Sequence, residues 1–372
     1  MNSSEKFNNL QHQPRILIAP LEWGLGHATR CIPLIRHLLK CHCEVFLAGE
    51  GATKALLHEE FPSLTFLPLR GYRIKYSRRK YLLPAKLFLQ IPKLILAIYN
   101  EHKWLGKTVE NYKIDAVISD NRLGLFHSKT FSIYITHQLT IKSNSRFAEY
   151  LASKTHSFFI KKYYECWVPD FRNDGIAGLL SHPVKIPTNV KYLGPLSRFK
   201  HLGDVEILYD LLIIISGPEP QRTIFEDILL KQLQGYSGRV LFVRGLPDQI
   251  KIDSQKFEHI EMKNHLSSED LNIAMQRSEI IISRSGYTTL MDLIKLQKKA
   301  ILIPTPGQTE QEYLSLYVMD KQMFYSVPQE QFSLLEALKE VQSFRFNIPE
   351  INMHAFENIL ERFVHRLKTS ND

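Results

Sequence analysis

The sequence has few cysteines, no apolar leader and no uninterrupted apolar run of membrane-spanning length. Its four cysteines include one Cys-x-Cys pair, Cys41 and Cys43, but no second pair at zinc spacing, so we expect reduced thiols and no structural metal. The polar first fifteen residues do not look like a secretory signal and favour a cytoplasmic location. Only 17 Gly and 18 Pro among 372 residues, with 44% hydrophobic residues, exclude disordered and collagen-like chains.

Acidic residues are absent from residues 61–100, where eight Lys and Arg residues occur. Residues 1–198 carry 28 basic against 14 acidic residues, whereas residues 199–372 carry 19 against 24. The overall charge of +9 therefore belongs to the first half of the chain. An electrostatic partner is expected to meet that half first.

The most hydrophobic stretch, Leu82 to Ile98, contains Lys86, Lys93 and two prolines and is too short to cross a membrane. Together with the basic run before it, residues 70–98 have the character of an interfacial element that rests on an anionic membrane. The alternative is a buried helix beside a solvated basic loop. A nucleic-acid partner is not expected, although the basic run could track phosphates.

Short apolar runs alternate with segments of helical length in both halves of the chain, which predicts an α/β protein with two Rossmann-like parallel sheets. We expect a first domain over residues 1–198 and a second over residues 199–345. Residues 346–372 are expected to form a C-terminal helix, with a return to the first domain as one option.

Two motifs in the first half sit where strands are expected to end. Gly24 and Gly26 follow the first strand and precede a helix, which suits a tight turn near an anion, and His27 comes directly after them. Asp120 ends a later strand and could hold the His27 imidazole if the two strands are neighbours. The alternatives are a structural or helix-capping histidine and an Asp that caps a helix.

The second half repeats this arrangement of strand, small-residue turn and helix. Ser216 and Gly217 form the first such turn, and Arg222 offers a guanidinium to a phosphate. A second turn, residues 283–289, offers backbone amides and threonine hydroxyls, and Asp292 on the following helix could reach a ribose. After another strand, residues 304–312 carry amide and carboxylate side chains that suit sugar hydroxyls.

Together these motifs resemble the family 28 glycosyltransferases, most specifically at residues 24–27 and at residues 284–292 with Gln311 and Glu312. The resemblance implies the GT-B fold, two Rossmann-like domains that face each other across a cleft, with the nucleotide sugar on the second domain. Besides Arg222, which the residues alone suggest, it implies the following donor-site residues: Ser216, Gly217, His265, Arg284, Ser285, Gly286, Thr288, Asp292, Gln311 and Glu312. His27 and Asp120 are similar in placement to a catalytic His-Asp pair.

The resemblance therefore implies an inverting, metal-independent hexosyltransferase that needs no cofactor. Its expected donor is a UDP-hexose or UDP-N-acetylhexosamine, and its acceptor is a hydroxyl, with a lipid-linked acceptor and peripheral attachment to the inner membrane face as options. The rival enzyme is a nucleotide-sugar hydrolase of the same fold. Rivals of another class are a nucleic-acid-binding protein and a sensor of sugar nucleotides.

Overall fold

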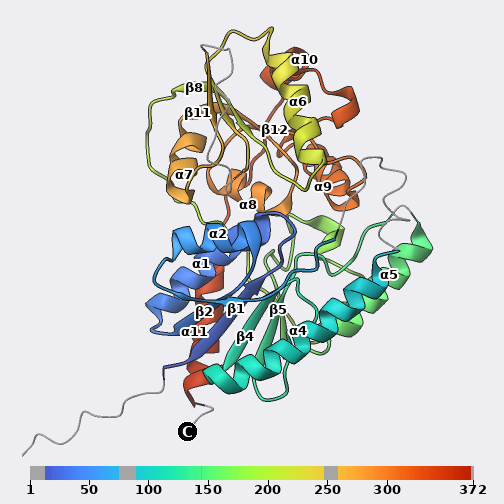
Figure 1. Ribbon diagram of the computed structural model, residues 1–372. Helices are drawn as coiled ribbons and strands as arrows, with labels where there is room; N and C mark the ends of the chain where they lie inside the picture. The colour runs from blue at the N-terminus through green and yellow to red at the C-terminus, as the bar shows by residue number, and fades with distance from the viewer. Residues whose placement is uncertain (1–12, 75–88, 144, 247–258, 370–372) are drawn as a thin grey trace, which may run out of the picture.

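The computed structural model describes residues 13–74, 89–143, 145–246 and 259–369, which form two lobes, each built around a parallel β-sheet (Figure 1). The first sheet has seven strands in the order β3-β2-β1-β4-β5-β6-β7, and the second has six in the order β10-β9-β8-β11-β12-β13. The expected α/β architecture with two Rossmann-like domains is confirmed. In the first sheet, β1 to β3 follow one another toward one edge and β4 to β7 toward the other, so the strand order reverses between β1 and β4. In the second sheet it reverses between β8 and β11. Sheets of this kind bind ligands at such positions.

The bounds of the elements follow the predicted alternation closely. The strands are β1 (Arg15–Pro20), β2 (Glu44–Gly49), β3 (Thr65–Pro68), β4 (Ala116–Asp120), β5 (Phe131–Ile135), β6 (Glu165–Val168), β7 (Val190–Tyr192), β8 (Tyr209–Ile214), β9 (Val240–Val243), β10 (Ile260–Lys263), β11 (Ser278–Ser283), β12 (Ala300–Leu302) and β13 (Tyr325–Ser326). The helices are α1 (Gly26–Lys40), α2 (Gly51–Glu60), α4 (Ile91–Tyr112), α5 (Arg146–Ile160), α6 (Gln221–Leu233), α7 (Ser268–Gln276), α8 (Tyr287–Lys295), α9 (Thr309–Asp320), α10 (Leu334–Ser343) and α11 (Ala355–Thr369), with short 3-10 turns at Gly178–Leu180 and Gln329–Gln331.

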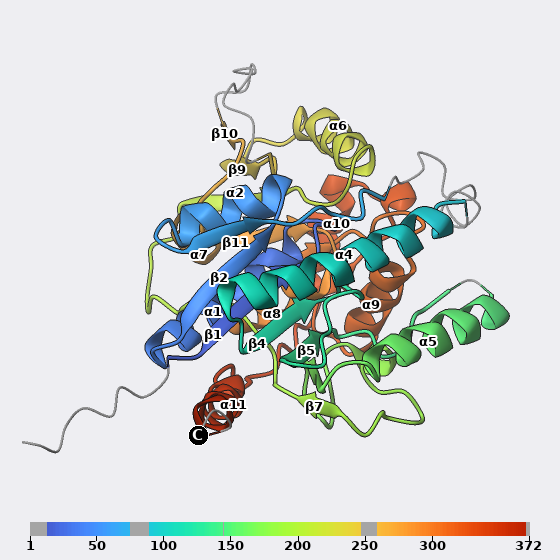
Figure 2. The same ribbon diagram turned by 60° about the horizontal axis from the view of Figure 1, so that its bottom comes forward.

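Helices cover both faces of the first sheet, so its central strands are apolar on both sides (Figure 2). Leu105 and Val109 of α4 pack with Leu17 and Val117 on one face. On the other face, α1 and α2 pack with strand residues that include Ile16. The alternation of inward and outward side chains along each strand divides the core into these two layers.

The C-terminal helix α11 packs against the first lobe, although the sequence before it belongs to the second (Figure 1). Its Phe363 is fully buried, with its ring 5.2 Å from Trp167 and edge-on to it. At the end of the helix, Arg366 pairs with Glu165 at 2.9 Å. The two lobes are thus joined by the link between β7 and β8 and by α11.

Strands β10 and β13 were not anticipated from the sequence, because their segments, IEMK and YS, contain no apolar run. The interfacial prediction for residues 70–98 falls partly on residues 75–88, which lie outside the described part of the chain. The residues from Ile91 to Ile98 form the first two turns of α4, and Ile95 and Leu96 there are 60% and 62% exposed. The alternative of a buried helix therefore does not hold for these two turns.

Candidate functional site

The turn between β1 and α1 brings the first lobe into direct contact with the second. Gly24 has a φ of +77°, a conformation that glycine adopts without steric cost, and the turn ends where α1 begins at Gly26. The Gly26 carbonyl accepts a hydrogen bond from the Thr288 hydroxyl at 3.1 Å, and Thr288 lies in the first turn of α8. A Cβ atom at position 26 would lie 3.3 Å from that hydroxyl, so glycine permits this close approach of the lobes.

His27 and Asp120 meet because their strands are neighbours. β1 and β4 pair in parallel, with Pro20 opposite Asp120, so the residues that follow β1 lie beside the end of β4. His27 Nδ1 is 2.8 Å from Asp120 Oδ1. The Asp120 side chain is fully buried, whereas the His27 side chain keeps 13% of its surface exposed. The Asp120 carboxylate therefore holds the His27 imidazole from the interior of the protein.

Sequence reasoning missed Arg30, which binds the same carboxylate. Arg30 Nε donates to Asp120 Oδ2 at 2.5 Å, and Nη2 donates to Oδ1, so the guanidinium is bidentate. Burial raises the pKa of Asp120, but the charges of Arg30 and His27 outweigh it and hold that pKa at about 2. His27 and Arg30 are three positions apart on a helix, which places both on one face, and this spacing was the available signal.

Two further residues extend this cluster into the second lobe. His137, just after β5, lies with Nδ1 3.0 Å from Arg30 Nη1. Its Nε2 lies 2.7 Å from Oε1 of Glu310, which belongs to the first turn of α9. The other Glu310 oxygen accepts from the side-chain amide of Gln138. No sequence pattern could reveal these contacts, because 173 residues separate His137 from Glu310.

In the second lobe, the predicted loops converge at the carboxyl ends of β8, β11 and β12. Gly217 follows β8 with a φ of +105°, and a Cβ atom there would lie 3.8 Å from the Thr305 hydroxyl. Arg284, which follows β11, is buried and donates to the carbonyls of Ile303 and Pro304. Burial lowers the pKa of Arg284 to about 9. Arg284 therefore holds the loop after β12 in place through two backbone carbonyls of that loop.

Arg222 makes contacts that the sequence prediction did not include. Its Nε donates to Glu219 at 2.6 Å, and its Nη1 donates to Glu226 and to the Arg244 carbonyl. Two carboxylates thus already offset its charge. A phosphate bound at the turn after β8 would meet the backbone N–H groups at the start of α6. It would also meet the Arg222 guanidinium, which already has acidic partners.

The residues of the α8 and α9 turns also hold the site together. Ser285 donates to the Gln311 carbonyl at 2.9 Å, and the Gln311 side-chain oxygen accepts from Thr305 N at 2.9 Å. Glu312 accepts from Gly307 N at 2.8 Å. Gln311 and Glu312 were predicted to bind the donor sugar. In the structure, one side-chain oxygen of each residue accepts a hydrogen bond from the loop over residues 304–307 and so fixes the shape of that loop.

Two other predicted donor residues lie at the boundary between the lobes. Asp292 accepts from the Ser197 hydroxyl at 2.6 Å. Burial raises the pKa of Asp292 to about 6, although the charge of Arg198 opposes this shift. His265 lies 3.6 Å from Glu59 of the first lobe, and Gly286 caps the N-terminus of α8.

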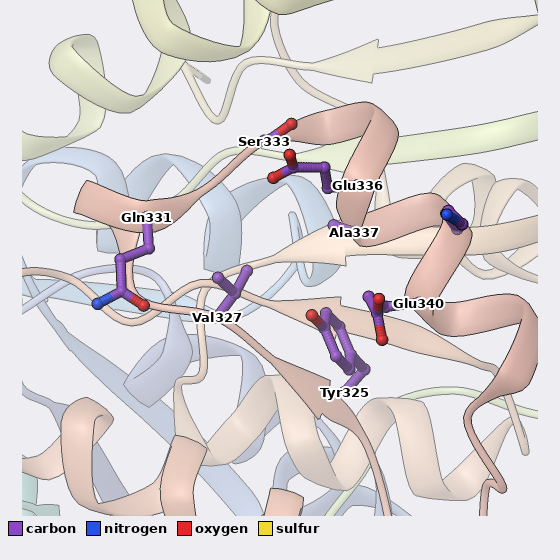
Figure 3. Close-up of a pocket in the computed structure, with 8 residues that line it drawn as sticks. Tyr325, Val327, Gln331, Ser333, Glu336, Ala337 and Glu340 are labelled. Carbon is purple, nitrogen blue, oxygen red and sulfur yellow. The ribbon is translucent and has the colours of Figure 1, made fainter.

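A pocket of about 350 Å³ lies elsewhere, between the edge strand β13 and α10 (Figure 3). The charged side chains that line it are the carboxylates Glu336 and Glu340 and the ammonium group of Lys339. None of the residues that line it belongs to the loops that follow β8, β11 and β12, so this pocket is not part of the candidate site. The converging loops of the two sheets remain the candidate site.

Comparison with known proteins shows sequence similarity to glycosyltransferases. Residues 224–367 match the glycosyltransferase family 28 C-terminal domain. A UDP-N-acetylglucosamine–N-acetylmuramyl-(pentapeptide) pyrophosphoryl-undecaprenol N-acetylglucosamine transferase of Natranaerobius thermophilus is 30% identical over 107 residues, which cover 26% of this chain and 29% of that protein. An uncharacterized glycosyltransferase of Methanosarcina acetivorans is 22% identical over 389 residues, which cover 94% and 93% of the two chains.

The fold is also similar to that of solved glycosyltransferases. The crystal structure of the glycotransferase of kitacinnamycin matches with a TM-score of 0.65 at 12% identity and covers 96% of this chain and 99% of its own. Likeness at this identity concerns the fold, whereas the family match concerns the sequence of residues 224–367, from within α6 to within α11. The chain therefore has the GT-B fold over nearly its whole length, and its residues 224–367 match the glycosyltransferase family 28 C-terminal domain.

Proposed function

We propose that this protein is an inverting glycosyltransferase that moves a hexose or N-acetylhexosamine from a UDP-sugar to an acceptor hydroxyl. The observation that carries the proposal is the hydrogen bond between His27 and the buried Asp120, at the point where α1 meets the N-terminus of α8. This arrangement places a candidate base of the first lobe beside the loops that we assign to the donor.

In this mechanism His27 is the general base. Nδ1 is contacted by the Asp120 carboxylate at 2.8 Å and by Arg30 Nη2, which can only donate, at 2.9 Å. We assign the proton to Nδ1, toward the ionised Asp120, which leaves the lone pair of Nε2 for the proton of the acceptor hydroxyl. The acceptor oxygen bonds to the anomeric carbon as the bond from that carbon to the diphosphate breaks. A single displacement of this kind inverts the anomeric centre. Asp120 stabilises the imidazolium that forms.

The leaving diphosphate takes up negative charge, which the second lobe is suited to stabilise. The helices α6, α8 and α9 begin just after β8, β11 and β12, and a helix N-terminus offers backbone N–H groups and a favourable dipole to an anion. Backbone groups of the β8 turn at Ser216 and Gly217 belong to this region. This proposal needs no metal ion to balance the charge.

The experiment that tests the function uses calorimetry with a panel of UDP-, GDP- and dTDP-sugars, followed by turnover assays with and without a lipid extract. We expect a UDP-sugar to bind and its consumption to require an acceptor, with inversion of the anomeric centre visible by NMR. Equal consumption without acceptor would identify a hydrolase, in which His27 activates water. Binding of none of these donors would refute both enzymes.

We also propose that the first lobe rests on an anionic membrane through the start of α4. Leu89, Ile95 and Leu96 are 79%, 60% and 62% exposed, and Lys93 lies among them. Apolar side chains beside basic ones suit the boundary between headgroups and acyl chains. No helix in the described ranges combines the length and apolar character needed to cross a bilayer.

The double substitution Ile95→Ser and Leu96→Ser is expected to weaken binding to anionic vesicles at least about tenfold, because two apolar side chains no longer enter the bilayer. Co-sedimentation with phosphatidylserine vesicles measures the effect. Leu335→Ser is a matched control, since Leu335 is 58% exposed on α10 of the second lobe. If both proteins bind like the unmodified chain, α4 is not the membrane contact.

A further inference from the structure

Glu310 is a charged residue of the second lobe that is bound mainly by the first. Its side chain is 22% exposed, and one oxygen faces His137 Nε2 at 2.7 Å while the other accepts from Gln138. Glu310 begins α9 together with Thr309, whose hydroxyl donates to the Lys142 carbonyl of the first lobe. The start of α9, next to Gln311 and Glu312, is thus tied to the lobe that carries His27.

His137 connects Glu310 to Arg30, and its hydrogen bonds determine which ring nitrogen carries the proton. Arg30 can only donate, so His137 Nδ1 accepts from it, and Nε2–H donates to Glu310. Burial lowers the pKa of His137, which is consistent with a neutral ring. The ring also stacks on Tyr287 of the second lobe at 4.4 Å. An unbroken series of bonds therefore runs from Glu310 through His137, Arg30 and Asp120 to His27.

We propose that Glu310 is a positioning residue that strengthens His27 as a base only while the two lobes are in contact. This inference rests on the proposed role of His27. The Arg30 guanidinium lies 2.9 Å from His27 Nδ1 and repels a proton on that ring, and the Glu310 carboxylate offsets the repulsion. Because Glu310 belongs to the lobe assigned to the donor, separation of the lobes removes this negative charge.

The sign of the effect follows from the groups around the imidazole. The titratable and charged groups that face this cluster are Arg30 and Cys31 from α1, Asp120 from β4, Tyr134 from β5, His137 from the loop after β5, Tyr287 from α8 and Glu310 from α9. Removal of the Glu310 charge leaves the positive charge of Arg30 less well offset, so the protonated His27 ring becomes less stable. The imidazole then accepts the acceptor's proton less readily.

Glu310→Gln tests the inference because it removes the charge and keeps the shape. In transfer assays with the UDP-sugar that binds most tightly in the calorimetric panel, we expect kcat at its pH plateau to fall roughly 3–10-fold and the acidic limb of the kcat/KM profile to move to lower pH by about 0.5–1 unit. Donor affinity measured by calorimetry should stay within about threefold. Glu357→Gln is the matched control, since Glu357 also pairs with a histidine, His354, at 2.9 Å but lies on α11, outside the proposed site.

A purely structural role of Glu310 predicts a lower kcat with an unmoved acidic limb, and that result would overturn the inference. An unchanged kcat and profile would overturn it as well. His137→Phe gives a second reading, since it keeps the aromatic stack on Tyr287 but breaks the bonds to Arg30 and Glu310, and it should move the limb in the same direction. If His27→Ala itself retains full activity, His27 is not the base, and the proposed mechanism is refuted together with this inference. A normal Glu310→Gln profile beside an inactive His27→Ala refutes this inference alone.

Discussion

Replacing His27 by alanine is expected to lower kcat by roughly 10²–10⁴, as for the loss of a general base. The physical reason is that Asp120, the carboxylate hydrogen-bonded to His27, is buried and already bound by Arg30, so it does not replace the imidazole as the base. Donor affinity should change little, because His27 belongs to the first lobe and the donor loops to the second. Initial-rate assays and calorimetry with the same donor measure the two quantities.

His58→Ala is the control for this experiment, because His58 is an exposed histidine on α2 of the same lobe. It should have the kcat of the unmodified protein. An unchanged kcat for His27→Ala would reject the role of His27 as base. A loss of donor binding in that variant would instead show that the imidazole contributes to donor binding.

Replacing Arg30 by methionine is expected to destabilise the first lobe by about 3–5 kcal/mol at neutral pH, because it leaves the Asp120 carboxylate buried without its main partner. Arg30 is 1% exposed and Asp120 is fully buried, so water cannot replace the lost bonds without opening the structure. All three tryptophans of the chain lie in the first lobe, so urea unfolding followed by tryptophan fluorescence reports on this lobe.

The pH dependence of this effect has a definite sign. In the unmodified protein the pKa of Asp120 is about 2, below its ordinary value of 3.8, so its stabilising contribution is present above about pH 4 and is lost as the pH falls toward 2. Without Arg30, burial raises the pKa of Asp120, and the folded variant takes up a proton at higher pH. The difference in stability between the two proteins should therefore shrink on acidification from pH 7.

Arg36→Met provides the matched control for the stability measurement. Arg36 lies on the same helix and pairs with Glu60 at 2.9 Å, but its side chain is 41% exposed. Such a pair contributes about 1 kcal/mol or less. Equal destabilisation by both substitutions, or a deficit for Arg30→Met that stays constant down to pH 3, would contradict the assignment of the effect to the buried Asp120.

Much of the fold and part of the candidate site could be predicted from local sequence patterns. Apolar runs bounded by turns located the longer strands, and a glycine turn before a helix located His27, because these features depend on nearest neighbours along the chain. The same reasoning placed Arg222 beside a phosphate without its acidic partners. Glu226 is four residues further along α6, on the same helix face, so this pairing was present in the sequence but not used.

The sequence alone determined the α/β class, the two successive sheets and the positions of His27 and Asp120 at strand ends, because backbone sterics, side-chain burial and helix periodicity act over a few residues. Only the tertiary structure decided that β1 and β4 are neighbours and that His137 bridges Arg30 to Glu310. It also decided that α11 packs on the first lobe. Such contacts between distant segments depend on how whole layers pack, and packing depends on the summed shape and charge of surfaces that no short stretch of sequence contains.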